Sequence, residues 1–303
     1  MRIVRSLLGR IAPGYRLLSE WTQEYDRIIS ARLLTAKTLQ NRQNNMRHIV
    51  ETLGHRPMRS IRPHEIALEV RRVWDSGRHV AARRMLLEAK ELFAEAVIAG
   101  WIDTNPAQPL RALPSSVKRS RLSLEQWQEI HSWATRSGIH WFAYALKLAL
   151  VSGQRRADIV KMAGSHVWND HLHIVQQKTG SRIALPLALR LDEINAELGE
   201  LIDEGLRHKA PGELLLRKAT GGGYGPAALS ASFARARNAV FPLRTWEDRT
   251  PPTFHEIRSL SERLHRARGV DTKTLLGHSK QSMTDLYNND RGLTRNDWKT
   301  LIL

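Results

Sequence analysis

The chain has 303 residues, 42% of them hydrophobic, which is enough for one large domain or two of ordinary size. The absence of cysteine excludes disulfides, thiolate metal sites and cysteine nucleophiles. A formal net charge of +17 indicates a large anionic partner such as nucleic acid, although ribosomal and structural basic proteins share this feature. Because no apolar run could span a membrane and no signal peptide is evident, we expect a cytoplasmic protein without a membrane partner.

The first hundred residues have apolar side chains at helical spacing. Within residues 17–34, Leu18, Trp21 and Tyr25 fall on one helix face, and we expect Ser19 to cap this helix. The same spacing predicts three further helices, over residues 35–54, 61–77 and 79–100. The sequence thus predicts an N-terminal extension over residues 1–16 and a helical domain over residues 17–105.

Residues 106–121 contain prolines, serines and a basic cluster, which is typical of an interdomain linker. The basic side chains of the cluster are Lys118, Arg119 and Arg121. Contact with a phosphate backbone and simple solvation are equally good interpretations of these charges.

Residues 122–303 are predicted to form a second domain. Ser123 is placed to cap its first helix, and the nearly continuous apolar segment 140–153 indicates a buried helix. Residues 171–187 contain two short strands around the turn sequence KTGS, which predicts a β-hairpin. We therefore expect a mainly α fold with a small β-hairpin or sheet, divided into two domains.

Three familiar motifs are incomplete in this chain. The His-Glu pair of TFHEIRSLSERL lacks the second histidine of a zinc protease, because Ser259 occupies that position. GHSKQ lacks the closing glycine of a nucleophile elbow, and the loop RKATGGGYGP lacks the Lys-Ser/Thr of a phosphate-binding loop. The thirteen histidines form no ligand pattern in the sequence. We therefore predict neither a metal site nor a cofactor.

A series of polar residues remains, and each has an ordinary structural explanation when it is taken alone. They lie in SGQRRADIVKM, QQKTGS, TFHEIR, LLGH and the segment around the last tyrosine. Their order along the chain resembles that of the tyrosine recombinases, the phage integrase family. The further segments NPAQPLRALPSSVKRSRL, TPPTFHEIRSLSERL and NDRG resemble the lambda integrase subgroup, and the resemblance extends from about residue 17 to the C-terminus. The residues that carry the catalytic signature are Arg155, Lys178, His255, Arg258, His278 and Tyr287.

The resemblance implies DNA cleavage through a 3′-phosphotyrosyl intermediate, without metal or nucleotide. It assigns Tyr287 as the nucleophile, His255 as its proton acceptor and Lys178 as the general acid. In the same way it places Arg155, Arg258 and His278 on the scissile phosphate. The neighbouring Arg156 competes with Arg155 for its role, and Gly-x-Arg spacing favours Arg155. The resemblance also implies that Asp158 orients an arginine.

The same resemblance implies a clamp of two domains around double-stranded DNA and a homotetramer on two recombination core sites in a bacterial host. The C-terminal tail is expected either to pack on a neighbouring protomer or to pack on its own chain. Only about sixteen residues precede the helical domain, so we expect no separate arm-binding domain. Candidate DNA contacts on the second predicted helix, with solvation as an equal alternative, are Lys37, Arg42 and Arg47.

Two alternatives to recombination remain open. A type IB topoisomerase would use the same chemistry to relax DNA, without exchanging strands between two sites. A DNA-binding regulator could keep the fold without the activity, but the presence of every catalytic residue argues against it.

Overall fold

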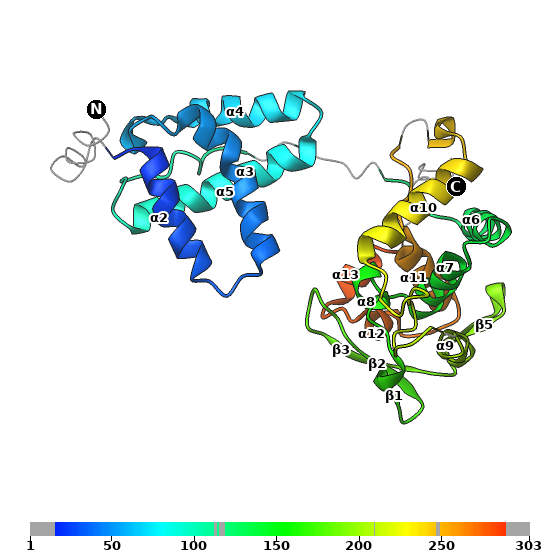
Figure 1. Ribbon diagram of the computed structural model, residues 1–303. Coiled ribbons are helices and arrows are strands. Elements are labelled where there is room, and N and C mark those ends of the chain that lie inside the picture. The colour runs from blue at the N-terminus through cyan, green and yellow to red at the C-terminus, as the bar shows by residue number, and fades with distance from the viewer. Residues whose placement is uncertain (1–15, 112–113, 115–118, 209, 247–248, 289–303) are drawn as a thin grey trace, which may run out of the picture. The chain divides into compact units, whose positions relative to one another are not determined.

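The computed structural model describes residues 16–111, 114, 119–208, 210–246 and 249–288. The chain divides into two compact units between residues 117 and 118 (Figure 1). The positions outside the described residues include Lys118, the predicted C-terminal tail at residues 297–303, and all of the predicted N-terminal extension except Arg16.

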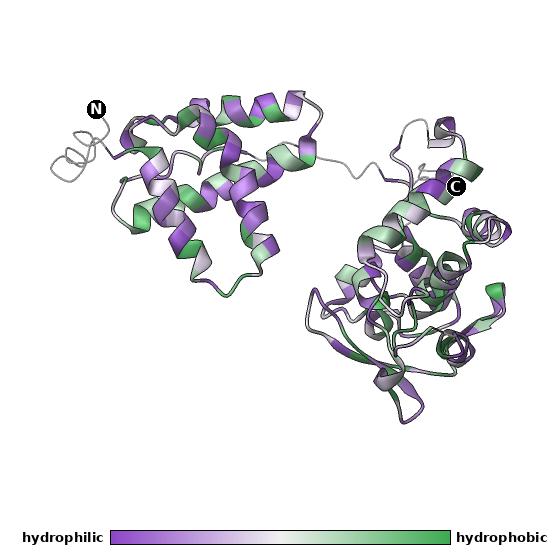
Figure 2. Ribbon diagram, in the orientation of Figure 1, coloured by the Kyte–Doolittle hydropathy of each residue, from purple (hydrophilic) through white to green (hydrophobic). Residues whose placement is uncertain are grey.

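The first unit is helical, as predicted. Its helices are α2 (Leu18–Ser30), α3 (Ala36–Leu53), α4 (Pro63–Asp75) and α5 (His79–Ile98), with a short 3-10 helix η2 (Met58–Ser60). Apolar and polar residues alternate along these helices (Figure 2), and the apolar faces meet in one core that contains Trp21 and Tyr25. The prediction of Ser19 as a cap was wrong. The N-cap is Leu17, two residues earlier, and its N–H donates to Glu20 Oε2 at 2.9 Å.

The second unit is built around the buried helix α7 (His140–Ser152), which Figure 2 shows largely in green. Ser123 caps α6 (Leu124–Arg136), the helix before α7, as predicted, by accepting the N–H of Gln126. The remaining helices are α8 (Arg156–Ile159), α9 (Leu198–Leu206), α10 (Pro226–Val240), α11 (Glu256–Ala267), α12 (Thr272–Leu276) and α13 (Gln281–Asp285), with 3-10 turns η3 (Gly164–His166), η4 (Asp192–Ile194) and η5 (Leu243–Trp246).

Two small antiparallel sheets complete this unit. The strands β1 (Val167–Trp168), β2 (His171–Val175) and β3 (Arg182–Pro186) pair in that order, with Ile174 opposite Ile183. Burial alternates along β2 and β3, so one face packs on the core, and the hairpin turn at residues 176–181 lies where KTGS predicted it. The pair β4 (Arg190–Leu191) and β5 (Ala196–Glu197) was not predicted.

The predicted linker at residues 106–121 is partly packed. Ala107 is buried in the core of the first unit, whereas Ser120 and Arg121 are buried in the second. Ser120 N–H donates to Thr250 O at 3.0 Å, which fixes the start of the second unit. Among the described residues, no helix is long and apolar enough to cross a membrane.

Candidate active site

A cavity of about 690 Å³ opens on the second unit, and five of the six predicted catalytic residues line it. They come from segments far apart in the sequence: the start of α8, the β2–β3 turn, the start of α11, the loop after α12 and the end of α13. The fold therefore gathers the predicted residues into one place. These five are Arg155, Lys178, His255, His278 and Tyr287.

Arg258, the sixth predicted residue, lies behind the cavity wall and is 1% exposed. Its guanidinium donates to Gly153 O at 2.8 Å and to Leu276 O at 2.5 Å. It also lies 5.8 Å from the centre of the Tyr287 ring. Burial, followed by the positive charge of Arg155, lowers the pKa of Arg258 to about 10, so the side chain still carries its charge at neutral pH.

His278 is held between Arg258 and Thr284. Its Nε2 lies 3.1 Å from Arg258 Nη2, and its Nδ1 lies 3.0 Å from Thr284 Oγ1. Because a guanidinium can only donate, Nε2 accepts, and the proton of the neutral ring is on Nδ1. Burial and the charges of Arg258 and Arg155 lower the pKa of His278 to about 4, which agrees with a neutral ring.

His255 faces the tyrosine. Its Nε2 lies 3.3 Å from Tyr287 Oη, both residues line the cavity, and His255 immediately precedes α11. Partial removal from water and the charges of Arg258 and Arg119 lower the pKa of His255 to about 4. The ring is therefore neutral at physiological pH and can accept a proton from the phenol.

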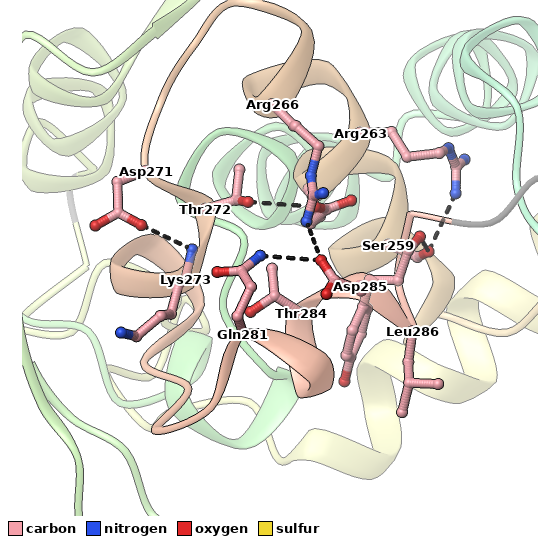
Figure 3. Close-up of polar contacts among 12 residues, drawn as sticks. Ser259, Arg263, Arg266, Asp271, Thr272, Lys273, Gln281, Thr284, Asp285 and Leu286 are labelled. Carbon is pink, nitrogen blue, oxygen red and sulfur yellow. Dashed lines mark hydrogen bonds and ion pairs between the residues drawn. The ribbon is translucent and has the colours of Figure 1, made fainter.

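The main chain beside Tyr287 is anchored to the rest of the unit. Ser259 Oγ donates to Tyr287 O at 2.8 Å, and Arg121 donates to the carbonyl of Leu286. Arg266 Nη2 donates to Asp285 Oδ1 at 3.1 Å (Figure 3). This bond joins α11 to the last turn before the tyrosine. Helix α11 thus fixes the tyrosine segment, and its N-terminal end supplies the histidine that the phenol faces.

Arg155 and Lys178 are both connected to the β2–β3 turn. Arg155 Nη1 donates to Gln176 Oε1 at 2.7 Å, and Lys178 lies exposed in the same turn. The competing Arg156 also lines the cavity, but its guanidinium donates to Ser230 on α10. The structure therefore connects Arg155, and not Arg156, to the turn that carries the lysine.

The role predicted for Asp158, the orientation of an arginine, stays a prediction. Asp158 Oδ1 accepts the backbone N–H of Gln177 at 2.8 Å, and the described part of the chain shows no hydrogen bond between Asp158 and an arginine. The carboxylate follows Arg155 by three residues in the chain, where it reaches the hairpin backbone instead. It orients the turn that presents Lys178.

The residues predicted to contact DNA fall into two groups. Arg42 pairs with the buried Glu88, Nε to Oε1 at 2.8 Å, and Arg121 pairs with Glu256 at 2.8 Å while it is 3% exposed. Both arginines form ion pairs within the protein, which favours a structural role, and their contacts with DNA stay a prediction. Of the remaining candidates that the structure describes, Lys37 and Arg47 are exposed on α3, and Arg119 lines the cavity.

Several residues of the site were missed in the sequence. Gln154 and Gln176 form a buried pair behind Arg155, and Ser259 binds the backbone of Tyr287. Glutamine and serine are uncharged and occur in many structural settings, so the residue type alone does not indicate a place in the site. Their place in the sequence does indicate it, because each lies within two residues of a predicted catalytic residue.

Comparisons with known proteins agree with this geometry. The profile described as the phage integrase family matches residues 120–292, and the profile of the phage integrase central domain matches residues 18–113. The integrase of Escherichia phage HK022 is 34% identical over 290 residues, covering 95% of this chain and 80% of that protein. The integrase of Escherichia phage lambda is 34% identical over 277 residues, covering 91% and 76%.

Solved structures give the same result. A crystal structure of a lambda integrase (75–356) dimer bound to a COC′ core site has a TM-score of 0.86 and 32% identity, covering 95% of this chain and 100% of that one. A lambda integrase tetramer bound to a Holliday junction also has a TM-score of 0.86, with 32% identity and coverage of 95% and 80%. The predicted fold class is confirmed. The chain belongs to the phage integrase family and is a tyrosine site-specific recombinase.

Proposed function

We propose that Tyr287 is the nucleophile and that the residues around the cavity have the roles predicted for them. Tyr287 Oη attacks the scissile phosphorus and passes its proton to His255 Nε2. The bond between phosphorus and the 5′ oxygen breaks, and Lys178 protonates that oxygen. The observation that carries this proposal is the 3.3 Å approach of Tyr287 Oη to His255 Nε2 in a cavity that also presents Arg155 and Lys178.

Positive charge stabilises the phosphate during both steps. Arg155 lines the cavity, and Arg258 lies directly behind His278. Each donor aimed at the transition state contributes roughly 3 kcal/mol in comparable sites. A 5′ hydroxyl of a second duplex then attacks the phosphotyrosyl phosphorus and releases the tyrosine, so the phosphodiester is rebuilt without an external energy source.

The substrate in this proposal is duplex DNA that carries recombination core sites. The reaction takes place in a tetramer on two such duplexes, on the DNA of a bacterial host and thus in its cytoplasm. The structural relatives that are bound to a core site and to a Holliday junction support this part. The charge of +17 agrees with a polyanionic partner.

The test uses a binding site selected from random duplex DNA and placed twice in a supercoiled plasmid. Wild type, Tyr287→Phe and the control Tyr224→Phe are incubated with it in EDTA. Tyr224 is stacked on Trp141 and is not part of the cavity wall. We expect recombinant plasmid and detergent-stable protein on DNA 3′ ends with wild type and the control, and neither product with Tyr287→Phe. Relaxation without recombinants would instead indicate a topoisomerase, and an adduct with Tyr287→Phe would exclude Tyr287 as the nucleophile.

A further inference from the structure

Gln176 is a fully buried amide between the two arginines of the proposed phosphate site. Its Oε1 accepts from Arg155 Nη1 at 2.7 Å and from Thr179 Oγ1 at 2.9 Å. Its Nε2 donates to Gln154 Oε1 at 2.8 Å and to Leu276 O at 3.0 Å. The full hydrogen-bonding capacity of the amide is therefore used within the protein.

The partners fix which way the amide faces. Arg155 can only donate, so the oxygen of Gln176 must face it, and the carbonyl of Leu276 can only accept, so the nitrogen must face that carbonyl. A carboxylate would lack the two donors, and an aliphatic side chain would lack all four bonds. Glutamine is thus the neutral side chain of this length that supplies both the acceptor for Arg155 and the donors for Gln154 and Leu276.

The same amide connects three parts of the site. Leu276 O also accepts from Arg258 Nη2, so Gln176 and Arg258 share one carbonyl. Thr179, next to Lys178, binds the oxygen that holds Arg155. A shift of Gln176 would therefore move Arg155, and it would also loosen the turn and the carbonyl against which Arg258 is placed.

We propose that Gln176 is a positioning residue for strand cleavage, which holds the Arg155 guanidinium in register with Arg258 and with the turn of Lys178. This inference depends on the proposed function, because it assumes that Arg155 contacts the scissile phosphate. Gln176 itself does not touch DNA in this arrangement.

The test compares Gln176→Met with Gln177→Met, the same substitution one residue later on an exposed side chain. The readouts are the single-turnover rate of 3′ adduct formation on the selected site, the Kd for that DNA and the thermal unfolding midpoint. Gln176→Met should slow adduct formation on the order of 10²-fold, as for the loss of one oriented donor, with Kd changed by less than about twofold. Gln177→Met should match wild type.

A double-mutant cycle separates positioning from a general structural role. Arg155→Lys keeps the charge but not the planar fork, so its residual rate provides the background. If Gln176 acts through Arg155, adding Gln176→Met to Arg155→Lys should reduce the rate by less than about threefold. A full additional 10²-fold loss, or a loss of DNA affinity that matches the loss of rate, would overturn the proposal.

Gln176→Glu covers the case in which Gln176→Met does not fold. It keeps the shape and the oxygen that faces Arg155 but lacks the donors to Gln154 and Leu276. A wild-type rate in either variant would contradict the proposal. If wild type and Gln177→Met also formed no adduct, the proposed function itself would be wrong, and the two failures are thereby distinguished.

Discussion

Tyr287 Oη and His255 Nε2 lie 3.3 Å apart, although 32 residues separate them in the chain. The contact exists because α11 begins next to the histidine and later binds the backbone of the tyrosine through Ser259. The lowered pKa of His255, about 4, leaves the imidazole neutral and able to accept a proton.

We expect His255→Gln to slow phosphotyrosyl formation by about 10²- to 10⁴-fold at pH 7.5, the usual contribution of a general base. The Kd for DNA should stay within about twofold, because the ring is neutral in the free protein. Quenched single-turnover assays and a binding titration measure the two effects. An unchanged rate would show that water or another group takes the phenolic proton.

Arg42 and Arg47 lie on the same helix but should respond differently to substitution. Arg42→Ala should destabilise the first unit by about 3 kcal/mol, because it leaves the buried Glu88 without its cation. Arg47→Ala should change stability by less than about 0.5 kcal/mol and, if it contacts phosphate, reduce the salt dependence of DNA binding by about one unit of slope.

Urea denaturation and DNA binding at several salt concentrations measure these two properties. The reverse pattern, with a lower salt slope for Arg42→Ala and reduced stability for Arg47→Ala, would contradict the assignments.

Two features of the structure favour glycine at position 277, the backbone angle and the lack of space for a side chain, and their effects on stability can be measured separately. The φ of +61° at Gly277 disfavours side chains, and a Cβ there would lie 2.9 Å from Gln176 Nε2. Gly269 has a φ of +77° but open space around its Cβ position, so Gly269→Ala is the matched control. Gly269→Ala should lose about 1 kcal/mol of unfolding free energy, and Gly277→Ala about 1–3 kcal/mol more because of overpacking. Equal losses in urea denaturation would show that Gln176 moves aside freely.

The stability of the second unit should fall as the solution is made acidic. An unfolded histidine takes up a proton near pH 6.5, whereas folded His278 does so only near pH 4. Between these values the unfolded state binds more protons, so the unfolding free energy decreases as pH falls through this window. His278→Gln should show a shallower decrease between pH 7 and pH 5, measured by urea denaturation at each pH. The same slope in both proteins would refute the contribution of His278.

The charged and aromatic residues of the candidate site could be selected from the sequence because each lies in a recognisable segment, and the structure brings five of the six to one cavity. Burial of the arginines could not be predicted in this way. Arg121 has its partner Glu256 135 residues further along the chain, so a basic linker and a buried ion pair have the same local sequence. The burial of Arg258 was not predicted either, because its guanidinium donates to the backbone carbonyls of Gly153 and Leu276, which no side-chain pattern reports.

Short secondary-structure elements and helix ends were also difficult to predict from the sequence. The β2–β3 hairpin was predicted because two short strands flank the turn sequence KTGS, and in the structure Gly180 of that turn has a φ of +67°. The β4–β5 pair has two residues in each strand, too few for any period to be seen. The capping of α2 was misplaced because Leu17 has no polar side chain, and the cap is made by Glu20 and a backbone N–H.

Under the proposed function, the hydrogen bond from Ser259 to the backbone of Tyr287 holds the nucleophile in the cavity of its own subunit. Since α11 carries Arg258 and holds the tyrosine of its own chain, we expect each subunit to have a complete cleavage centre. Mixing Tyr287→Phe with Arg155→Lys should therefore give no complementation, because no subunit of the mixture has an intact set. In mixtures of wild type and Tyr287→Phe, the amount of strand cleavage should be proportional to the fraction of wild-type chains. Each wild-type chain would then contribute one active site, whatever its neighbours are.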